Sequence, residues 1–153
     1  MSIQALEEVL KAEIGIAAQD LGAATATGTG FDTRDYDEAL VILNVATTDG
    51  TLNVKLQESS DDGDADAYAD ITGAVFTEID TANDNSIYVA RIRVKNFERY
   101  MRVIGVGTGT TTVFGVTVLL GKFDGLSKVT QVNPTEFALD YISDGGTEGS
   151  SAT

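Results

Sequence analysis

The sequence predicts an all-β protein built as an antiparallel, jelly-roll-like β-sandwich. Segments that alternate apolar and polar residues follow one another along the middle of the chain, and turn signals separate them about every ten residues. Gly occurs 16 times in the 153 residues whereas Pro occurs once, and a chain rich in Gly and Thr suits strands joined by turns. Strands and helices do not alternate, so a parallel α/β sheet is not expected.

The first part of the chain, residues 1–30, is expected to form a short helix and an extended arm outside the sandwich. The apolar residues of SIQALEEVLKAE follow near-helical spacing and Ser2 suits the N-cap position, so a helix is predicted over residues 2–13. A helix this short is marginal alone and needs a surface to dock on. Residues 15–30 are rich in Ala, Gly and Thr, which predicts an extended arm or linker.

The strands of the sandwich are recognised by their hydrophobic pattern and by the turns between them. The predicted strands are residues 38–47, 51–59, 68–79, 87–95, 98–107 and 110–121. The pair Asp49-Gly50 and the stretch Gly107–Gly109 each predict a hairpin turn between consecutive strands. The third strand is expected to bend or bulge at Gly73.

These strands assign the sandwich domain to residues 31–133. One further strand is expected from residues 26–34 or 126–133. The rest of the chain, residues 134–153, is assigned to a C-terminal tail, and its last part from Asp144 (DGGTEGSSAT) is predicted to be flexible, as terminal segments often are.

The composition argues against an enzyme. The chain has no Cys and no His, which removes disulfides, thiolate metal sites, the usual general base and every Ser-His or Cys-His nucleophile arrangement. Lys plus Arg is 10 against 24 Asp plus Glu, for a formal net charge of -14, so a nucleic-acid partner is not expected. No apolar run reaches the about 18 residues that span a bilayer and no signal peptide is recognised, so the protein is expected to be cytoplasmic when made, without a membrane partner.

One loop offers a candidate metal site. Residues 60–67 join two predicted strands and contain closely spaced carboxylates, which are ligands that Ca²⁺ prefers. Asp62, Asp64 and Asp66 reproduce the opening spacing of an EF-hand loop, but the positions that require Gly and Glu hold Ala and Gly. The plainer interpretation is a solvated hairpin loop whose charges prevent edge aggregation. No cofactor is therefore expected, and Ca²⁺ at these three residues is the alternative.

Half of the Lys and Arg residues lie close together in the sequence, at Arg91, Arg93, Lys95, Arg99 and Arg102. The first three share one face of the strand predicted over residues 87–95. One interpretation is an exposed sheet face that nearby carboxylates balance. The other is a partner-binding surface for an acidic protein, in which electrostatic complementarity sets the orientation.

The order LNVKLQESSDDGDADAYADITG, then IYVARIRV, then ERYMRVIGVGTGTTTVFGVTVLLGKF resembles small structural proteins of tailed bacteriophages, namely head decoration, cement or minor capsid proteins. The resemblance covers roughly residues 38–123 and concerns element order and turn chemistry. It implies a jelly-roll-like sandwich that binds the outside of an assembled capsid as a homotrimer, or alternatively a dimer, and clamps neighbouring subunits. No set of functional residues transfers with it.

The expected function is that of a virion structural protein on the capsid exterior, with the major capsid protein as its partner. One alternative is a carbohydrate- or protein-binding module of a phage tail, fibre or head-completion complex. Carbohydrate-binding modules usually expose an aromatic platform, whereas this chain has no Trp and most of its 5 Tyr and 6 Phe fit strand positions. A second alternative is a hydrolase that uses carboxylates alone.

Overall fold

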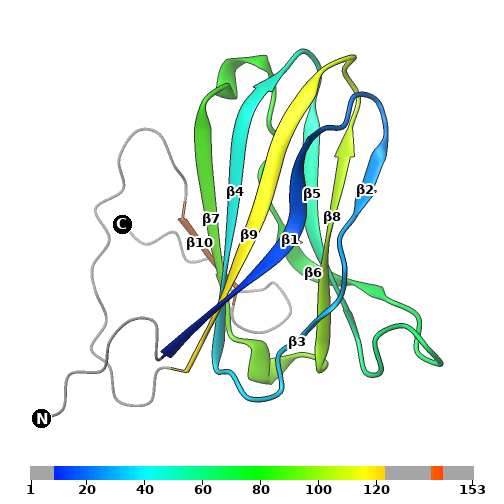
Figure 1. Cartoon of the computed structure of the whole chain (residues 1–153), viewed down its shortest axis with the longest axis vertical. Coiled ribbons are helices and arrows are strands. Elements are labelled where there is room, and N and C mark those ends of the chain that lie inside the picture. The colour runs from blue at the N-terminus through cyan, green and yellow to red at the C-terminus, as the bar shows by residue number, and fades with distance from the viewer. Residues whose placement is uncertain (1–8, 123–138, 143–153) are drawn as a thin grey trace, which may run out of the picture.

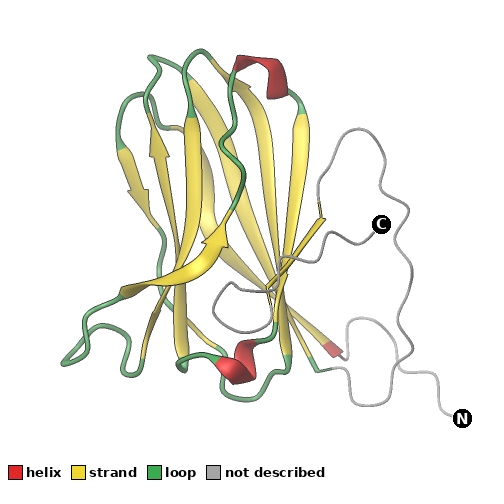
Figure 2. Ribbon diagram, turned by 180° about the vertical axis from the view of Figure 1, so that it is seen from behind, coloured by secondary structure: helices red, strands yellow, loops and turns green. Residues whose placement is uncertain are grey.

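Two β-sheets packed face to face form the protein (Figures 1 and 2). The computed structural model describes residues 9–122 and 139–142. Sheet A contains, in spatial order, β1 (Leu10–Asp20), β9 (Thr112–Gly121), β4 (Glu38–Thr48), β7 (Ser86–Ile92) and β10 (Leu139–Ile142). Sheet B contains β2 (Thr25–Thr27), β8 (Tyr100–Gly107), β5 (Leu52–Ser59) and β6 (Ala69–Val75), and β3 (Phe31–Asp32) pairs with β8. Short 3₁₀ helices, η1 (Thr81–Asn83) and η2 (Val94–Asn96), lie on either side of β7.

The strand order is that of a jelly roll. Between β1 and β9 the chain passes from one sheet to the other at every connection except β2–β3 and the β5–β6 hairpin. With β2 and β3 counted as one interrupted strand, this alternation gives the double Greek key of a jelly-roll sandwich. The all-β, jelly-roll-like prediction is therefore confirmed, with one exception to its antiparallel character, because β10 pairs with β7 in parallel.

Both hairpins predicted from turn signals are wrong, because each turn carries the chain from one sheet to the other. The turn at Asp49 joins β4 to β5, and the turn at Thr108 joins β8 to β9. The two turns bond to each other: Thr111 N–H donates to the Asp49 carboxylate at 2.9 Å, and Thr108 N–H donates to the Thr51 carbonyl at 3.0 Å. Turn chemistry shows where the chain reverses but not which sheet the next strand joins.

The helix predicted over residues 2–13 is wrong from Leu10 onward, although the described Val9 is helical. Leu10–Asp20 is the edge strand β1, which pairs antiparallel with β9 from Leu10 opposite Gly121 onward, while residues 1–8 lie outside the described residues. Ile16 of β1 is 4% exposed in the core. Pairing with β9 and burial of Ile16 therefore override a weak helical pattern.

The arm predicted over residues 15–30 is extended, but it is part of the sandwich. Thr25–Thr27 pairs with β8, and Gly28 N–H donates to the Val103 carbonyl at 2.8 Å. A side chain at Gly28 would collide with the Gly15 carbonyl oxygen, so glycine is required where this segment passes β1. This stretch covers the open side between the two sheets.

Alternating apolar residues of both sheets fill the core, as the strand patterns predict. In sheet A the fully or almost fully buried side chains include Ala39, Val41, Leu43, Val45, Phe114, Val116, Val118 and Leu120. In sheet B they include Leu52, Val54, Leu56, Met101 and Val103. Each large side chain contributes roughly 1.5–3 kcal/mol on burial, so this interface between the sheets is the main source of stability.

Several predicted boundaries shift in the structure. The third strand does bend at Gly73, where φ is +80° and the pairing of β5 with β6 changes register nearby. The strand predicted to end at residue 95 stops at Ile92, and η2 follows. Leu139–Ile142, within the predicted tail, forms β10. The strand predicted at 126–133 and the tail from Asp144 lie outside the described residues.

Candidate functional site

The five basic residues predicted to form one docking surface do not share a face. Arg91 lies on the outer side of sheet A, with its Nε 3.9 Å from a Glu38 carboxylate oxygen. Lys95 lies in η2 and forms an ion pair with Asp37, and the exposed Arg93 precedes η2. Arg99 and Arg102 belong to the β8 side of the molecule. Arg91, Arg93 and Lys95 still alternate with the buried Ile92 and Val94, although β7 ends at Ile92 and η2 follows.

Arg99 connects β3 to the start of β8. Its Nε donates to Asp32 Oδ1 at 3.0 Å and its Nη2 donates to Asp32 Oδ2 at 2.6 Å, while its guanidinium lies 4.7 Å from the Tyr100 ring centroid. The hydrogen bond from Arg99 holds the pKa of Asp32 below its usual range. This two-pronged geometry fixes the guanidinium in place.

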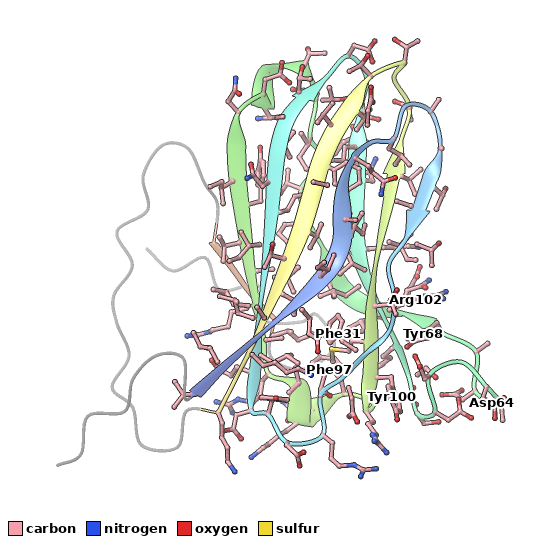
Figure 3. All side chains as sticks on the ribbon, viewed as in Figure 1. Phe31, Asp64, Tyr68, Phe97, Tyr100 and Arg102 are labelled. Atoms are coloured by element: carbon pink, nitrogen blue, oxygen red, sulfur yellow. The ribbon has the colours of Figure 1, made fainter. Side chains whose placement is uncertain are left out.

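Arg102 and Tyr68 form a second polar group on the outer side of sheet B (Figure 3). The Arg102 guanidinium lies 4.2 Å from the Tyr68 ring centroid, and its Nε donates to Gln57 Oε1 at 2.8 Å. The Tyr68 hydroxyl donates to Asp62 Oδ1 at 2.5 Å. Burial and the bond to Asp62 raise the pKa of Tyr68. The sequence placed Tyr68 only at the start of the strand predicted over residues 68–79, and the pairing of β5 with β8 and β6 is needed to place it beside Arg102.

The acidic loop between β5 and β6 is organised by its own hydrogen bonds. Figure 2 shows it projecting from the lower corner of sheet B. Asp61 accepts from the N–H groups of Asp64, Ala65 and Asp66 at 3.1, 2.8 and 3.1 Å, and Asp66 accepts from Ser60 N–H at 2.8 Å. These backbone donors hold the pKa values of Asp61 and Asp66 below their usual range.

The EF-hand-like spacing does not bring its three carboxylates together. Asp62 bonds Tyr68, Asp66 bonds Ser60, and Asp64 lies at the tip of the loop (Figure 3). Over residues 9–122 and 139–142, no three acidic side chains are grouped so that they could hold a metal ion. The loop's carboxylates instead hold its backbone in place.

Most of the described basic residues lie at one end of the sandwich, which we call the η2 end, together with acidic residues that include Asp32, Asp37, Glu38, Glu98 and those of the 60–67 loop. This end comprises η2, β3 and the starts of β1 and β8, which strand pairing brings together. The basic residues at this end are Lys11, Arg34, Arg93, Lys95, Arg99 and Lys122. At the opposite end, formed by η1 and the turns after β4 and β8, the described charged residues are all acidic: Asp20, Asp49, Glu78, Asp80 and Asp84.

The outer face of sheet A carries a shallow groove of about 380 Å³, which we call the β1 groove. It lies where β1 runs beside β9 (Figure 1). The residues lining it include Ile14, Ala17, Ala18, Asn44, Ala46, Val113, Gly115 and Thr117. Ile14 is 70% exposed at the groove. No charged side chain lines the groove, in contrast to both ends of the sandwich.

Together, the fold and these surfaces define a jelly-roll β-sandwich with one end that carries both basic and acidic residues, an opposite end whose described charges are all acidic, and an uncharged groove. In the described part of the chain, no helix has the length and apolar character needed to cross a bilayer.

No protein-family model and no curated protein matches this chain. Among solved structures, the fold is similar to that of the PBSX exported protein XepA, with a TM-score of 0.55 and 14% identity. The match covers 81% of this chain and 41% of XepA, so the chain spans about two fifths of that protein's length. At this identity the likeness shows the fold alone.

Two further structures are less similar. One is a Bacillus endospore appendage protein that forms disulfide-linked pili, with a TM-score of 0.45 and 13% identity over 75% of this chain and 90% of that one. The other is PirA, with a TM-score of 0.44 and 13% identity over 69% of this chain and 93% of that one.

Proposed function

We propose that this protein is a non-enzymatic structural component of a phage particle. It binds the outer surface of the capsid and stabilises contacts between neighbouring major capsid subunits, as a homotrimer or a dimer and without a cofactor. The uneven placement of the basic residues is the observation that supports this function, because only the η2 end of the sandwich offers cations that could contact an acidic surface. The sequence resemblance to phage decoration proteins supplies the class of partner.

The η2 end is the proposed docking surface. Arg93 and Arg34 are exposed there, and Lys95 projects from η2 beside Asp37. Across an interface, such charges set orientation and association rate more than raw affinity. The described charged residues of the opposite end are all acidic, so that end has no cation to contact such a surface and the proposal assigns the contact to the η2 end.

The first test asks whether the protein is present on particles. Phage particles purified from cells that make the protein should contain it at a fixed ratio to the major shell protein, measured by quantitative mass spectrometry. Particles that contain it should also release DNA at a higher temperature than particles that lack it. Absence from particles, or presence without a fixed ratio, would overturn the proposal.

The second test asks whether the η2 end makes the contact. The double variant Arg93→Glu, Lys95→Glu should fold normally, because both residues are exposed, and should bind capsids at least about tenfold more weakly in cosedimentation. Lys55→Glu is the matched control, since Lys55 pairs with Asp70 on sheet B, away from η2. Equal binding by all three proteins would exclude the η2 end.

The alternative function is a carbohydrate- or protein-binding module of a phage tail, fibre or head-completion complex. The Tyr68–Arg102 pair favours it, because aromatic and Arg side chains are frequent in binding surfaces. XepA, which shares the fold, is described as an exported protein. Binding of the wild type to a glycan array, with loss of that binding in Tyr68→Ala, would establish this alternative. Absence of any glycan binding would exclude a carbohydrate-binding module.

A further inference from the structure

The β1 groove is shaped by irregular pairing of its strands. The pairing of β1 with β9 changes register between Ile14 and Ile16 and again between Ile16 and Gln19. The pairing of β4 with β9 changes register between Val45 and Thr47. Such bulges bend a strand out of the plane of its sheet. They leave a hollow over the middle of β9.

Small residues form the floor of the hollow and a large one stands beside it. A side chain at Gly115 would lie 3.1 Å from the Ala18 Cα, so glycine keeps β9 and β1 close at this point. Ala17, Ala18 and Ala46 present only methyl groups. Ile14, at 70% exposure, is the most exposed large apolar side chain in the described chain. The same face therefore holds both a projecting side chain and a recess.

We propose that the β1 groove is an interface between copies of this chain. Two copies with a net charge of -14 each repel one another wherever their charges face. The groove is lined without a charged side chain, so copies can meet there without that repulsion. The centres of protein interfaces are depleted of charge in the same way.

The shape of the face fits a second copy. The projecting Ile14 and the recess at Ala18 and Gly115 lie on one surface, so a two-fold rotation places the Ile14 of each copy in the recess of the other. A closed, symmetric contact of this kind uses the same patch on both subunits.

Pairing through the free edge of β1 is the competing way for copies to meet. An unpaired edge strand offers backbone donors and acceptors to another chain. The two register changes within β1 interrupt the regular spacing that a strand ladder requires. The observations thus favour contact through the face over contact through the edge.

This inference deepens the proposed function, which includes self-association, by naming the surface involved and by selecting the dimer over the homotrimer. Self-association through the β1 groove and capsid binding through the η2 end involve separate surfaces. A variant that loses self-association but keeps capsid binding, or the reverse, would show that the two surfaces act independently.

The first experiment measures association of the full chain by sedimentation velocity over a range of concentrations. The wild type is expected to associate reversibly, and Ile14→Glu is expected to weaken association at least about tenfold, because it places an unpaired charge in the contact. Val75→Glu is the matched control, since Val75 is 53% exposed on the other sheet, and it should associate like the wild type.

The second experiment uses the absence of native Cys. Chains carrying Ile14→Cys and chains carrying Ala18→Cys, when mixed and oxidised, should form a mixed disulfide, whereas Val75→Cys mixed with Ala18→Cys should not. The proposal is overturned by a wild type that stays monomeric at all concentrations, or by Ile14→Glu associating as tightly as the wild type. Loss of capsid binding in Ile14→Glu without any change in association would overturn it too, by assigning the face to another partner.

Discussion

Individual charged side chains at the η2 end form more ion pairs and hydrogen bonds within the protein than the sequence suggests. Arg99 is held by Asp32, and Lys95 is held by Asp37. Other acidic side chains, which have no such basic partner among the described residues, lie close to one another near the 60–67 loop. Glu98 lies there, its N–H donates to Glu58 Oε2 at 2.8 Å, and burial together with the carboxylate of Asp66 raises its pKa. Exposed ion pairs of this kind contribute little stability, so their role is to position loops.

The raised pKa of Glu98 predicts a pH-dependent stability. The folded protein holds the Glu98 proton more tightly than the unfolded chain, so stability from this group is fully present below its ordinary pKa and is lost as pH rises through the raised value. Glu98→Gln should therefore have a higher melting temperature than the wild type at pH 7, and the difference should shrink toward pH 4, as measured by calorimetry.

Asp64→Asn serves as the control for this experiment, because Asp64 lies at the tip of the same loop and its loss removes the same formal charge. It should leave the melting temperature nearly unchanged. An equal increase in both variants would assign the effect to net charge rather than to the surroundings of Glu98.

Among the elements, the segment between β1 and β3 differs most from its expected role. The sequence suggested a free arm, yet β2 pairs with β8 and Gly28 packs against the backbone of Gly15. The segment thus closes one side of the sandwich. Its stability contribution comes from backbone pairing and close approach rather than from large apolar side chains.

This role predicts that Gly28→Ala destabilises the protein. The added methyl group would collide with the Gly15 carbonyl oxygen and lie 2.9 Å from the Val103 carbonyl oxygen, which should cost about 1–3 kcal/mol in the free energy of unfolding. Urea denaturation would measure it. Thr29→Ala, at an exposed neighbouring position, should cost much less. Equal stability of the two variants would mean that the segment is a free arm after all.

Strand positions were predictable because each buried face repeats every second residue. The core residues of β4 and β9 alternate as their sequence patterns predict. Partner sheets were not predictable, because the turns at Asp49 and Gly109 have the chemistry of hairpins although both cross between sheets. The candidate surfaces were not predictable for the same reason. Arg102 meets Tyr68, and Ile14 lies beside Gly115, only once the strand order is known.

For the molecule as a whole, charge and apolar surface are distributed separately. The η2 end carries the described basic residues except Lys55, Arg91 and Arg102, together with many acidic residues, and the described charges of the opposite end are all acidic. The β1 groove lies between the ends and is uncharged. A particle component needs to attach in one orientation and to meet its neighbours without repulsion. This arrangement supplies one surface for each task, and increasing salt should weaken end-on attachment more than contact through the groove.

The pairing of β1 with β9 also determines when the protein can fold. Leu10 and Gly121 are opposite one another although they are separated by nearly the whole sandwich domain. β1 is synthesised long before β9, so it must wait for β9 before it can pair in sheet A. Pairings of such long sequence separation slow folding. During that delay Ile14 and the backbone of β1 can contact other nascent chains. The yield of folded protein during rapid synthesis would therefore depend on how soon β9 is synthesised.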